Sequence, residues 1–251
     1  MILLTSKQTA TLKNRFLPET PGPLIGSHVI QTGHGACFVD RWPMPRVVLI
    51  ETADNYRLLG NPLALTPSDI QQHLTGFVET TEDFVPLLTE AFPDVITWPR
   101  IIFVQPDIPK LTAAADNVSL RRLEPSDAEH LSKLDPESFW ISKTWGGPEG
   151  LAASGYGWGA FVDARLVSVA CTFFLGQNYE DIGVITEAKF RGLGLSLACS
   201  NALCQDIHAR CHQPSWTTSP DNVASARVAE KLGFVMQRHD QLYVVGIPIP
   251  R

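Results

Sequence analysis

The residues best suited to chemistry lie in one stretch of the C-terminal half, from Tyr179 to Ile207. A β-branched, apolar run predicts a strand from Glu180 to Thr186, and an alanine- and leucine-rich run after Gly194 predicts a helix. Glycines at 192 and 194 lack the Cβ atoms that would keep an anion away from the backbone. The unpaired N–H groups of the helix start point into the same space, and Arg191 adds a positive charge. The stretch therefore predicts a cradle for a pyrophosphate group.

Two common phosphate-binding patterns do not fit these glycines. The dinucleotide pattern G-x-G-x-x-G is absent, because Leu197 stands where its third glycine would be. The P-loop pattern is absent as well, since no Gly-Lys-Ser/Thr follows. A glycine pair between a strand and a helix can also be turn chemistry alone.

The pattern that fits best is R-x-x-G-x-[G/A] after a strand, matched by Arg191 and Gly194, with Ser196 at the last position. It resembles the acyl-CoA pyrophosphate loop of the GCN5-related N-acetyltransferases, the GNAT superfamily. A second block, Asn222 to Phe234, is similar to the later N-x-x-[S/A]…K-L-G-F helix of that family. The resemblance implies an α/β chain with the GNAT fold, a mixed and splayed central sheet flanked by helices.

The resemblance also implies where acetyl-CoA would bind, namely in a gap between two parallel strands. Backbone at the end of the fourth strand would pair with the pantetheine amides, and the loop amides would bind the pyrophosphate. Asn222 and Ser225 would contact the cofactor from the other strand's side, although Asn222 fits a simple N-cap equally well. The predicted cofactor-binding residues are Val184, Ile185, Thr186, Arg191, Gly192, Leu193, Gly194, Leu195, Ser196, Asn222 and Ser225.

The reaction implied by the resemblance is direct attack of a substrate amine on the thioester. Many family members place a tyrosine as proton donor on the last helix, where this chain has Ala229. The donor would then be Ser225, Tyr243 or a water, or the thiolate would leave unassisted.

The base for the amine is sought among carboxylates near the predicted strand. Glu180 and Asp181 are the first candidates, and strand alternation sends them to opposite faces, so that only one can face the substrate groove. Glu137, in an aromatic-rich stretch, is a further candidate. Each can equally be a surface carboxylate, and a water relay would need no dedicated base. The predicted catalytic residues are Glu180, Glu137 and Ser225.

Composition limits the partners. A net charge of −6 over 251 residues argues against general nucleic-acid binding, which needs a basic face. No window approaches a membrane span and the N-terminus does not read as a signal peptide, so we expect a cytoplasmic protein that binds no membrane. The five cysteines lack paired spacing, which indicates reduced thiols.

Four potential metal ligands lie close together near the end of the predicted helix. Cys204, His208, Cys211 and His212 have spacings that bring them near one helix face. No second ligand cluster accompanies them, and such residues at a helix C-terminus usually reflect packing and dipole complementarity. We therefore expect no metal.

The N-terminal half predicts a second α/β unit. A proline- and alanine-rich stretch around 105–116 separates a domain at 1–112 from the GNAT domain at 113–251. Gly35 to Asp40 resembles Gly159 to Asp163, and a degenerate tandem copy that lacks the glycine loop would explain the resemblance. Chance similarity of two hairpins explains the echo equally well.

The extra N-terminal half and the I-x-T-x-x-x-F-R-G-x-G-L run loosely resemble the bacterial branch with the zwittermicin-resistance acetyltransferases. This resemblance implies acetyl transfer to a primary amine of a small molecule. Two alternatives remain: a non-catalytic acyl-CoA sensor or scaffold, and a protein or peptide N-acetyltransferase. A monomer and a homodimer are both compatible with the sequence.

Overall fold

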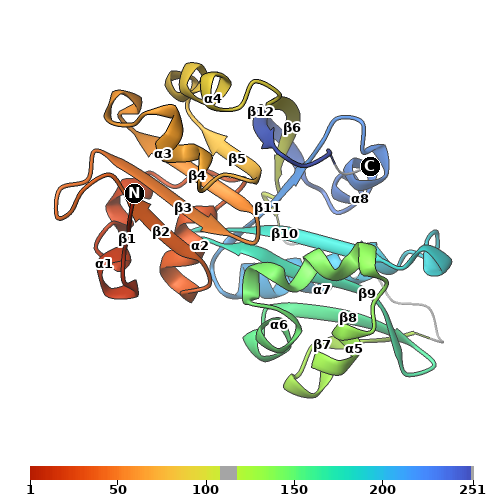
Figure 1. The fold of residues 1–251 in the computed structure, drawn as a ribbon. Helices are drawn as coiled ribbons and strands as arrows, with labels where there is room; N and C mark the ends of the chain where they lie inside the picture. Colours follow the sequence, from red (N-terminus) through yellow and green to blue (C-terminus); the bar gives the residue numbers. More distant parts are fainter. Residues whose placement is uncertain (108–117, 250–251) are drawn as a thin grey trace. The chain divides into compact units, whose positions relative to one another are not determined.

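The computed structural model describes residues 1–107 and 118–249 (Figure 1). The chain forms two compact units, and each is discontinuous in sequence. Unit 1 comprises Met1–Pro18, Ile25–Arg100 and His239–Arg251, and unit 2 comprises Glu19–Leu24 and Ile101–Arg238. The domain boundary expected after residue 112, and most of the expected linker, lie outside the described residues.

Unit 2 contains the predicted pyrophosphate loop. Its strand order is β7-β8-β9-β10-β11-β6, in which β10 and β11 pair in parallel and the other neighbouring strands pair antiparallel. The strands are β7 (Ser119–Arg122), β8 (Gly157–Val162), β9 (Arg165–Leu175), β10 (Tyr179–Thr186), β11 (Gln213–Thr218) and the end of β6 (Ile96–Val104). The helices are η4 (Pro125–Asp127), α5 (Ala128–Ser132), η5 (Pro136–Trp145), α6 (Pro148–Ser154), η6 (Ala188–Phe190), α7 (Leu195–Ala209) and α8 (Val223–Lys231).

Helix α7 lies on one face of this sheet because its apolar residues recur every four positions. Leu195, Cys199, Leu203 and Ile207 are all at most 3% exposed and pack with Trp216 of β11. On the opposite face, side chains of β9 and β10 pack against η5 and α6. That cluster includes Val169, Cys171, Ile185, Ile141, Trp145 and Leu151. Strand alternation thus separates two cores, and Val184 of β10 packs with the first while Ile185 packs in the second.

Within unit 1 the strand order is β1-β2-β3-β4-β5-β12. Its strands are β1 (Ile2–Leu3), β2 (Ala36–Val39), β3 (Val47–Thr52), β4 (Asn55–Gly60), β5 (Gly76–Thr80) and the end of β12 (Val235–Val245). Its helices are α1 (Ser6–Ala10), η1 (Lys13–Phe16), α2 (Ile25–Thr32), η2 (Pro62–Ala64), α3 (Pro67–Gln71), η3 (Glu82–Phe84) and α4 (Val85–Ala91). In this unit β4 and β5 pair in parallel, and the other neighbouring strands pair antiparallel.

The two units repeat one topology. In each, four antiparallel strands are followed by a fifth that pairs in parallel with the fourth. The sequence echo falls on the second strand of each unit, β2 and β8. In each unit the sixth strand comes from the opposite half of the chain: Tyr243 of β12 pairs with Val78 of β5, and Phe103 of β6 pairs with Trp216 of β11. The α/β fold and the tandem arrangement are therefore confirmed.

Candidate acyl-CoA site

The parallel strands β10 and β11 separate partway along their length. Their pairing is recorded for Tyr179 to Asp181 only, whereas β10 pairs with β9 as far as Thr186. A register shift at Asp181/Ile182 marks the point of separation. From Ile182 onward, the edge of β10 that faces β11 thus has no strand partner among the described residues. The predicted pantetheine-binding residues Val184, Ile185 and Thr186 lie on this open edge, and their role stays a prediction.

The glycine loop follows this edge directly and is open to solvent. Gly192 has φ of 80° and Gly194 has φ of 76°, conformations that favour glycine, and a Cβ at either position would meet nothing within 4 Å. Helix α7 then begins at Leu195 with no side-chain cap. The N–H groups from Gly192 to Ser196 form no backbone hydrogen bond in the part of the chain that the structure describes. Five backbone N–H groups are therefore available next to the open space at the two glycines.

Polar contacts hold the loop against the sheet. The Arg191 Nε donates to the Thr186 carbonyl oxygen at 3.3 Å, which keeps the guanidinium beside the glycines. Glu187, at the start of the loop, is 2% exposed and accepts from Arg165 at 2.6 Å. Its own N–H donates to the Val167 carbonyl oxygen at 2.9 Å. A positive charge and the loop backbone are thus fixed beside the open edge of β10.

The second sequence block forms α8. The Asn222 side chain accepts from the Ser225 N–H at 3.1 Å, so it is the N-cap of this helix. The Ser225 hydroxyl accepts from the Trp216 indole at 2.9 Å. Ala229, at the position of the family's tyrosine, is fully buried in the core against α7. The cap role of Asn222 leaves its predicted contact with the cofactor open, as it does that of Ser225.

Asp181 and Glu180 point to opposite faces of β10, as alternation requires. Asp181, 4% exposed, accepts from the Ser215 and Thr217 hydroxyls of β11 at 2.9 and 3.0 Å. Ser215 and Thr217 flank Trp216, whose side chain packs toward α7 and α8. Asp181 therefore lies on the face away from α7, at the closed end of the gap.

An N-terminal segment of unit 2 reaches this place. The Gly22 N–H donates to the Ser215 hydroxyl at 3.4 Å, and the Glu19 carboxylate accepts from the N–H groups of residues 177–179, just before and at the start of β10. In the sequence the segment is only a proline-rich run, so no local pattern indicated that it belongs with the C-terminal half.

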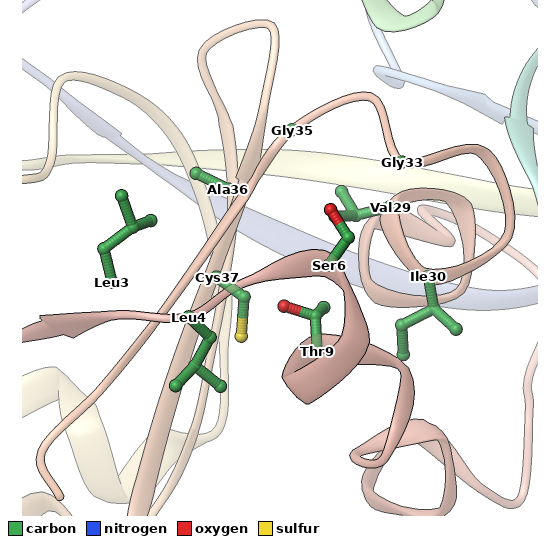
Figure 2. A pocket seen from close by; sticks show the side chains of 10 residues that line it. All are labelled: Leu3, Leu4, Ser6, Thr9, Val29, Ile30, Gly33, Gly35, Ala36 and Cys37. Carbon is green, nitrogen blue, oxygen red and sulfur yellow. The ribbon is translucent and has the colours of Figure 1, made fainter. Parts of the chain in front are cut away.

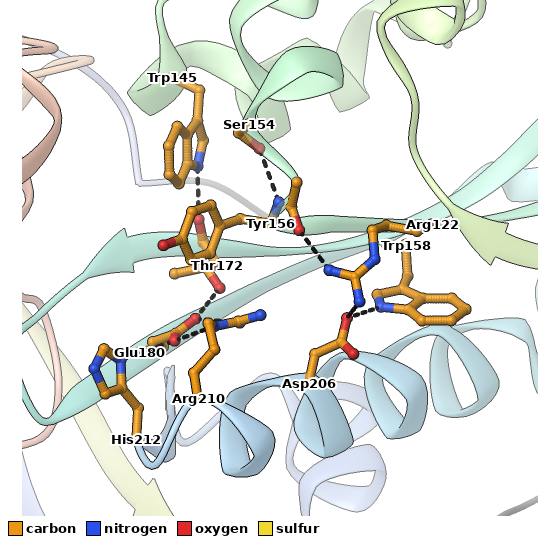
Figure 3. A network of polar contacts seen from close by, with 11 residues as sticks. Arg122, Trp145, Ser154, Tyr156, Trp158, Thr172, Glu180, Asp206, Arg210 and His212 are labelled. Atoms are coloured by element: carbon orange, nitrogen blue, oxygen red, sulfur yellow. Dashed lines mark hydrogen bonds and ion pairs between the residues drawn. The ribbon is translucent and has the colours of Figure 1, made fainter.

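Glu180 is the centre of a buried polar network (Figure 3). It is fully buried, and its carboxylate accepts from Arg210 through two hydrogen bonds at 2.9 and 2.7 Å. The His212 Nδ1 lies 2.9 Å from one oxygen, and the Thr172 hydroxyl donates to the other at 2.5 Å. A carboxylate with four donors is poorly placed to take a proton from a substrate. These contacts favour a structural role for Glu180, and its assignment as the base stays a prediction.

Aromatic side chains extend this network. The Tyr156 ring stacks on the Trp145 ring with 5.0 Å between the ring centroids, and the Arg210 guanidinium lies 4.7 Å from the centroid of the Tyr156 ring (Figure 3). The Trp158 indole donates to the Asp206 carboxylate at 2.6 Å. By contrast, Trp140 on η5 is 37% exposed and contacts Phe173. Glu137, the remaining candidate base, is exposed in the first turn of the same element.

The four potential metal ligands near the end of α7 have separate partners or surroundings. His208 lies 3.0 Å from the Gln105 amide oxygen, and burial lowers its pKa, while His212 contacts Glu180. Cys204 is fully buried and Cys211 is exposed. Within residues 1–107 and 118–249, no three histidine, cysteine or acidic side chains are grouped to hold a metal ion.

Unit 1 has a cavity of a different character, about 260 Å³ in volume, between β1, α1, α2 and β2 (Figure 2). Burial raises the pKa of the Cys37 thiol on its wall to about 11. None of the lining residues is charged, so the cavity is unsuited to a polyanion. After β4, unit 1 has Asn61 to Thr66 without a glycine, and α3 is only five residues long. The pyrophosphate loop thus has no counterpart there.

Comparison with known proteins agrees with this geometry. The profile of a family described as GNAT acetyltransferase matches residues 19–243, which include both units. The chain belongs to this family. An uncharacterized N-acetyltransferase from the mutA 5′ region of Streptomyces virginiae is 40% identical over 199 residues, covering 78% of this chain and 84% of that protein. The GNAT chain is therefore an acetyltransferase.

Solved structures share the GNAT fold. A GCN5-related N-acetyltransferase-like protein from Streptococcus suis superposes with a TM-score of 0.72 at 19% identity, over 95% of this chain and 98% of that one. A tandem GNAT protein from the clavulanic acid biosynthesis pathway superposes with a TM-score of 0.59 at 14% identity, over 95% and 94%. The narrower resemblance to the zwittermicin-resistance branch stays a prediction. No described helix has the length and hydropathy to cross a membrane.

Proposed function

We propose that this GNAT acetyltransferase moves the acetyl group of acetyl-CoA to a primary amine of a small molecule. One observation carries the proposal: the open edge of β10 leads directly into five backbone N–H groups that form no backbone hydrogen bond among the described residues, with Arg191 beside them. Pyrophosphate is an anion of the size and charge that such a helix start binds. The pantetheine arm would continue along the open edge, where backbone amides from Ile182 to Thr186 can pair with its own amides.

The acyl group would then lie near the closed end of the gap. The amine nitrogen attacks the thioester carbon, the carbon–sulfur bond breaks, and coenzyme A leaves as a thiolate. A backbone N–H on the open edge would stabilise the oxyanion. Asp181 is better placed than Glu180 to accept the amine proton, because it lies on the face away from the pyrophosphate loop and β10 separates from β11 beside it.

The proton for the thiolate has two candidate sources. Ser225 accepts the Trp216 N–H, so its own proton remains for donation to a group on the cofactor side. Ala229 is buried and can supply none. If Ser225 lies too far from the sulfur, the thiolate takes a proton from water after it leaves.

A non-catalytic acyl-CoA sensor is the competing function, and the buried alanine at the family's tyrosine position is the observation that favours it. Acetyl transfer to a protein or peptide is the second alternative. For a small acceptor, the exposed Trp140 and the carboxylates of Asp181 and Glu137 would provide contacts with an apolar body and an ammonium group.

The experiment is calorimetric titration with acetyl-CoA, followed by a thiol-release screen over small amines, polyamines, amino sugars and peptides. Binding with release for small amines is the expected result. Binding with release only for peptides would replace the acceptor class, and binding without release would favour the sensor. A protein that does not bind acetyl-CoA would contradict the proposal.

A further inference from the structure

We propose that Ser168 is a positioning residue for the pyrophosphate loop, acting through a chain of hydroxyl groups that directs the Ser196 proton into the fold. The inference rests on the proposed binding of acetyl-CoA. It goes further by stating which groups of the loop can donate to the phosphates. The relevant residues come from three elements: Ser168 from β9, Thr186 from the end of β10 and Ser196 from the first turn of α7.

The chain of contacts is short and continuous. Ser196 Oγ lies 2.7 Å from Thr186 Oγ1, and Thr186 Oγ1 lies 2.7 Å from Ser168 Oγ. Ser168 Oγ donates to the Ile185 carbonyl oxygen at 2.8 Å. Ser168 is fully buried, and its own carbonyl oxygen lies 3.8 Å from the thiol of Cys199, one turn further along α7. Ser168 therefore contacts both the loop end of β10 and the first turns of α7.

The direction of the chain follows from the number of protons. A hydroxyl group has one proton to donate. Ser168 uses its proton on the Ile185 carbonyl, so in the next contact Thr186 must be the donor to Ser168. Thr186 has then used its proton, so Ser196 must be the donor to Thr186. Every proton in the chain points away from the loop and toward the sheet.

This direction limits how the loop can recognise an anion. Phosphate oxygens accept hydrogen bonds and require donors, but the Ser196 hydroxyl has only lone pairs left to present. The donors are then the backbone N–H groups from Gly192 to Ser196, together with Arg191. The serine hydroxyl sets the position of these N–H groups, because it fixes the start of α7 to the end of β10.

The test measures the dissociation constant of acetyl-CoA and the unfolding midpoint for S168A, T186V and S196A. Ser200→Ala is the matched control, since Ser200 lies one turn further on α7, is fully buried and has no hydrogen-bond partner among the described residues. We expect S168A, T186V and S196A each to raise the dissociation constant of acetyl-CoA about three- to tenfold, as the loss of one hydrogen bond predicts. S200A should leave it unchanged. In steady-state assays the KM for acetyl-CoA should rise while kcat changes little, and T186S should bind more tightly than T186V.

A double-mutant cycle separates positioning from direct contact. If Ser196 acts through Thr186, T186V/S196A should bind acetyl-CoA no more weakly than the weaker single variant. Additive losses would mean that Ser196 donates to the phosphate, and would overturn the proposal. If S168A binds acetyl-CoA as tightly as the wild-type protein does, the positioning role of Ser168 would be overturned too. The proposed function would still stand in that case, because the wild-type protein binds acetyl-CoA. Absence of wild-type binding would overturn both. If S168A fails to fold, the cycle on the two partly buried residues decides.

Discussion

Arg210 holds the Glu180 carboxylate in a two-point contact, with Nε donating to Oε1 at 2.9 Å and Nη2 donating to Oε2 at 2.7 Å. Arg210 directly follows α7, and Glu180 is the second residue of β10, in the part that pairs with β11. At the other end, Ser196 of α7 contacts Thr186 of β10. Polar contacts therefore join helix and strand at both ends, with apolar side chains packed between them.

Replacing Glu180 with glutamine should cost stability rather than chemistry. The change leaves a partly buried guanidinium without its counter-charge, and we expect the free energy of unfolding to fall by about 3 kcal/mol. The matched control is Glu129→Gln, which removes the same charge from an exposed pair with Lys133 and should barely move the denaturation midpoint. A large loss of kcat with unchanged stability would instead identify Glu180 as the base.

Asp181→Asn should have the opposite profile. If Asp181 accepts the amine proton, kcat should fall about 100-fold or more in this variant. Calorimetry should give the variant the same affinity for acetyl-CoA as the wild-type protein. Asp163→Asn, in an exposed turn with φ of 48° that asparagine tolerates, is the control and should retain full turnover. Full activity of D181N would leave Glu137 or a water relay as the route for the proton.

Arg191→Ala should weaken acetyl-CoA binding by about 1.5–3 kcal/mol, because it removes a charge-assisted contact with the pyrophosphate. The difference from wild type should shrink as salt is added, since exposed charges are screened. Lys133→Ala changes the net charge equally at an exposed ion pair with Glu129 and should have no effect on the titration. An unaltered affinity in R191A would mean that the arginine only closes the loop onto Thr186.

Gly194→Ala tests the space above the helix start. Gly194 and Gly155 have almost the same φ, 76° and 77°, and both have open surroundings, so alanine costs each about 1 kcal/mol in backbone strain. Only at Gly194 does the added methyl group enter the space proposed for the phosphates. We therefore expect equal thermal shifts in the two variants and a loss of acetyl-CoA affinity in G194A alone. Equal affinities would place the pyrophosphate elsewhere.

Tyr243→Ala tests the pairing of β12 with β5. Tyr243 is 4% exposed, pairs with Val78 of β5 and packs in the core of unit 1, so its truncation should cost about 3–5 kcal/mol. Hydrogen exchange should then accelerate in β4 and β5, far away in sequence, and less in α8, which is close in sequence. Faster exchange confined to residues after 218 would contradict this pairing. These contacts give Tyr243 a packing role, and the proton-donor role considered from the sequence stays a prediction.

Much of the fold and of the loop could be predicted from local sequence. The glycines at 192 and 194 need their positive φ wherever they occur, and apolar residues every four positions in α7 must face a core. The two motif blocks, in the order in which they occur, were enough to predict the family and the α/β fold. The alternation of β10 was predicted too, so Glu180 and Asp181 were expected on opposite faces.

Tertiary structure decided which face each carboxylate would occupy, because that depends on where α7 packs and on Arg210 thirty residues away. It also decided that the segment from Glu19 to Leu24 belongs with unit 2. The strand β6, from the first half of the sequence, pairs with β11, and β12, from the second half, pairs with β5. Such pairings join strands distant in sequence, and their stability comes from cross-strand hydrogen bonds and side-chain burial. The strand propensity of a segment does not specify which other strand it pairs with, so only the tertiary structure could identify these pairs.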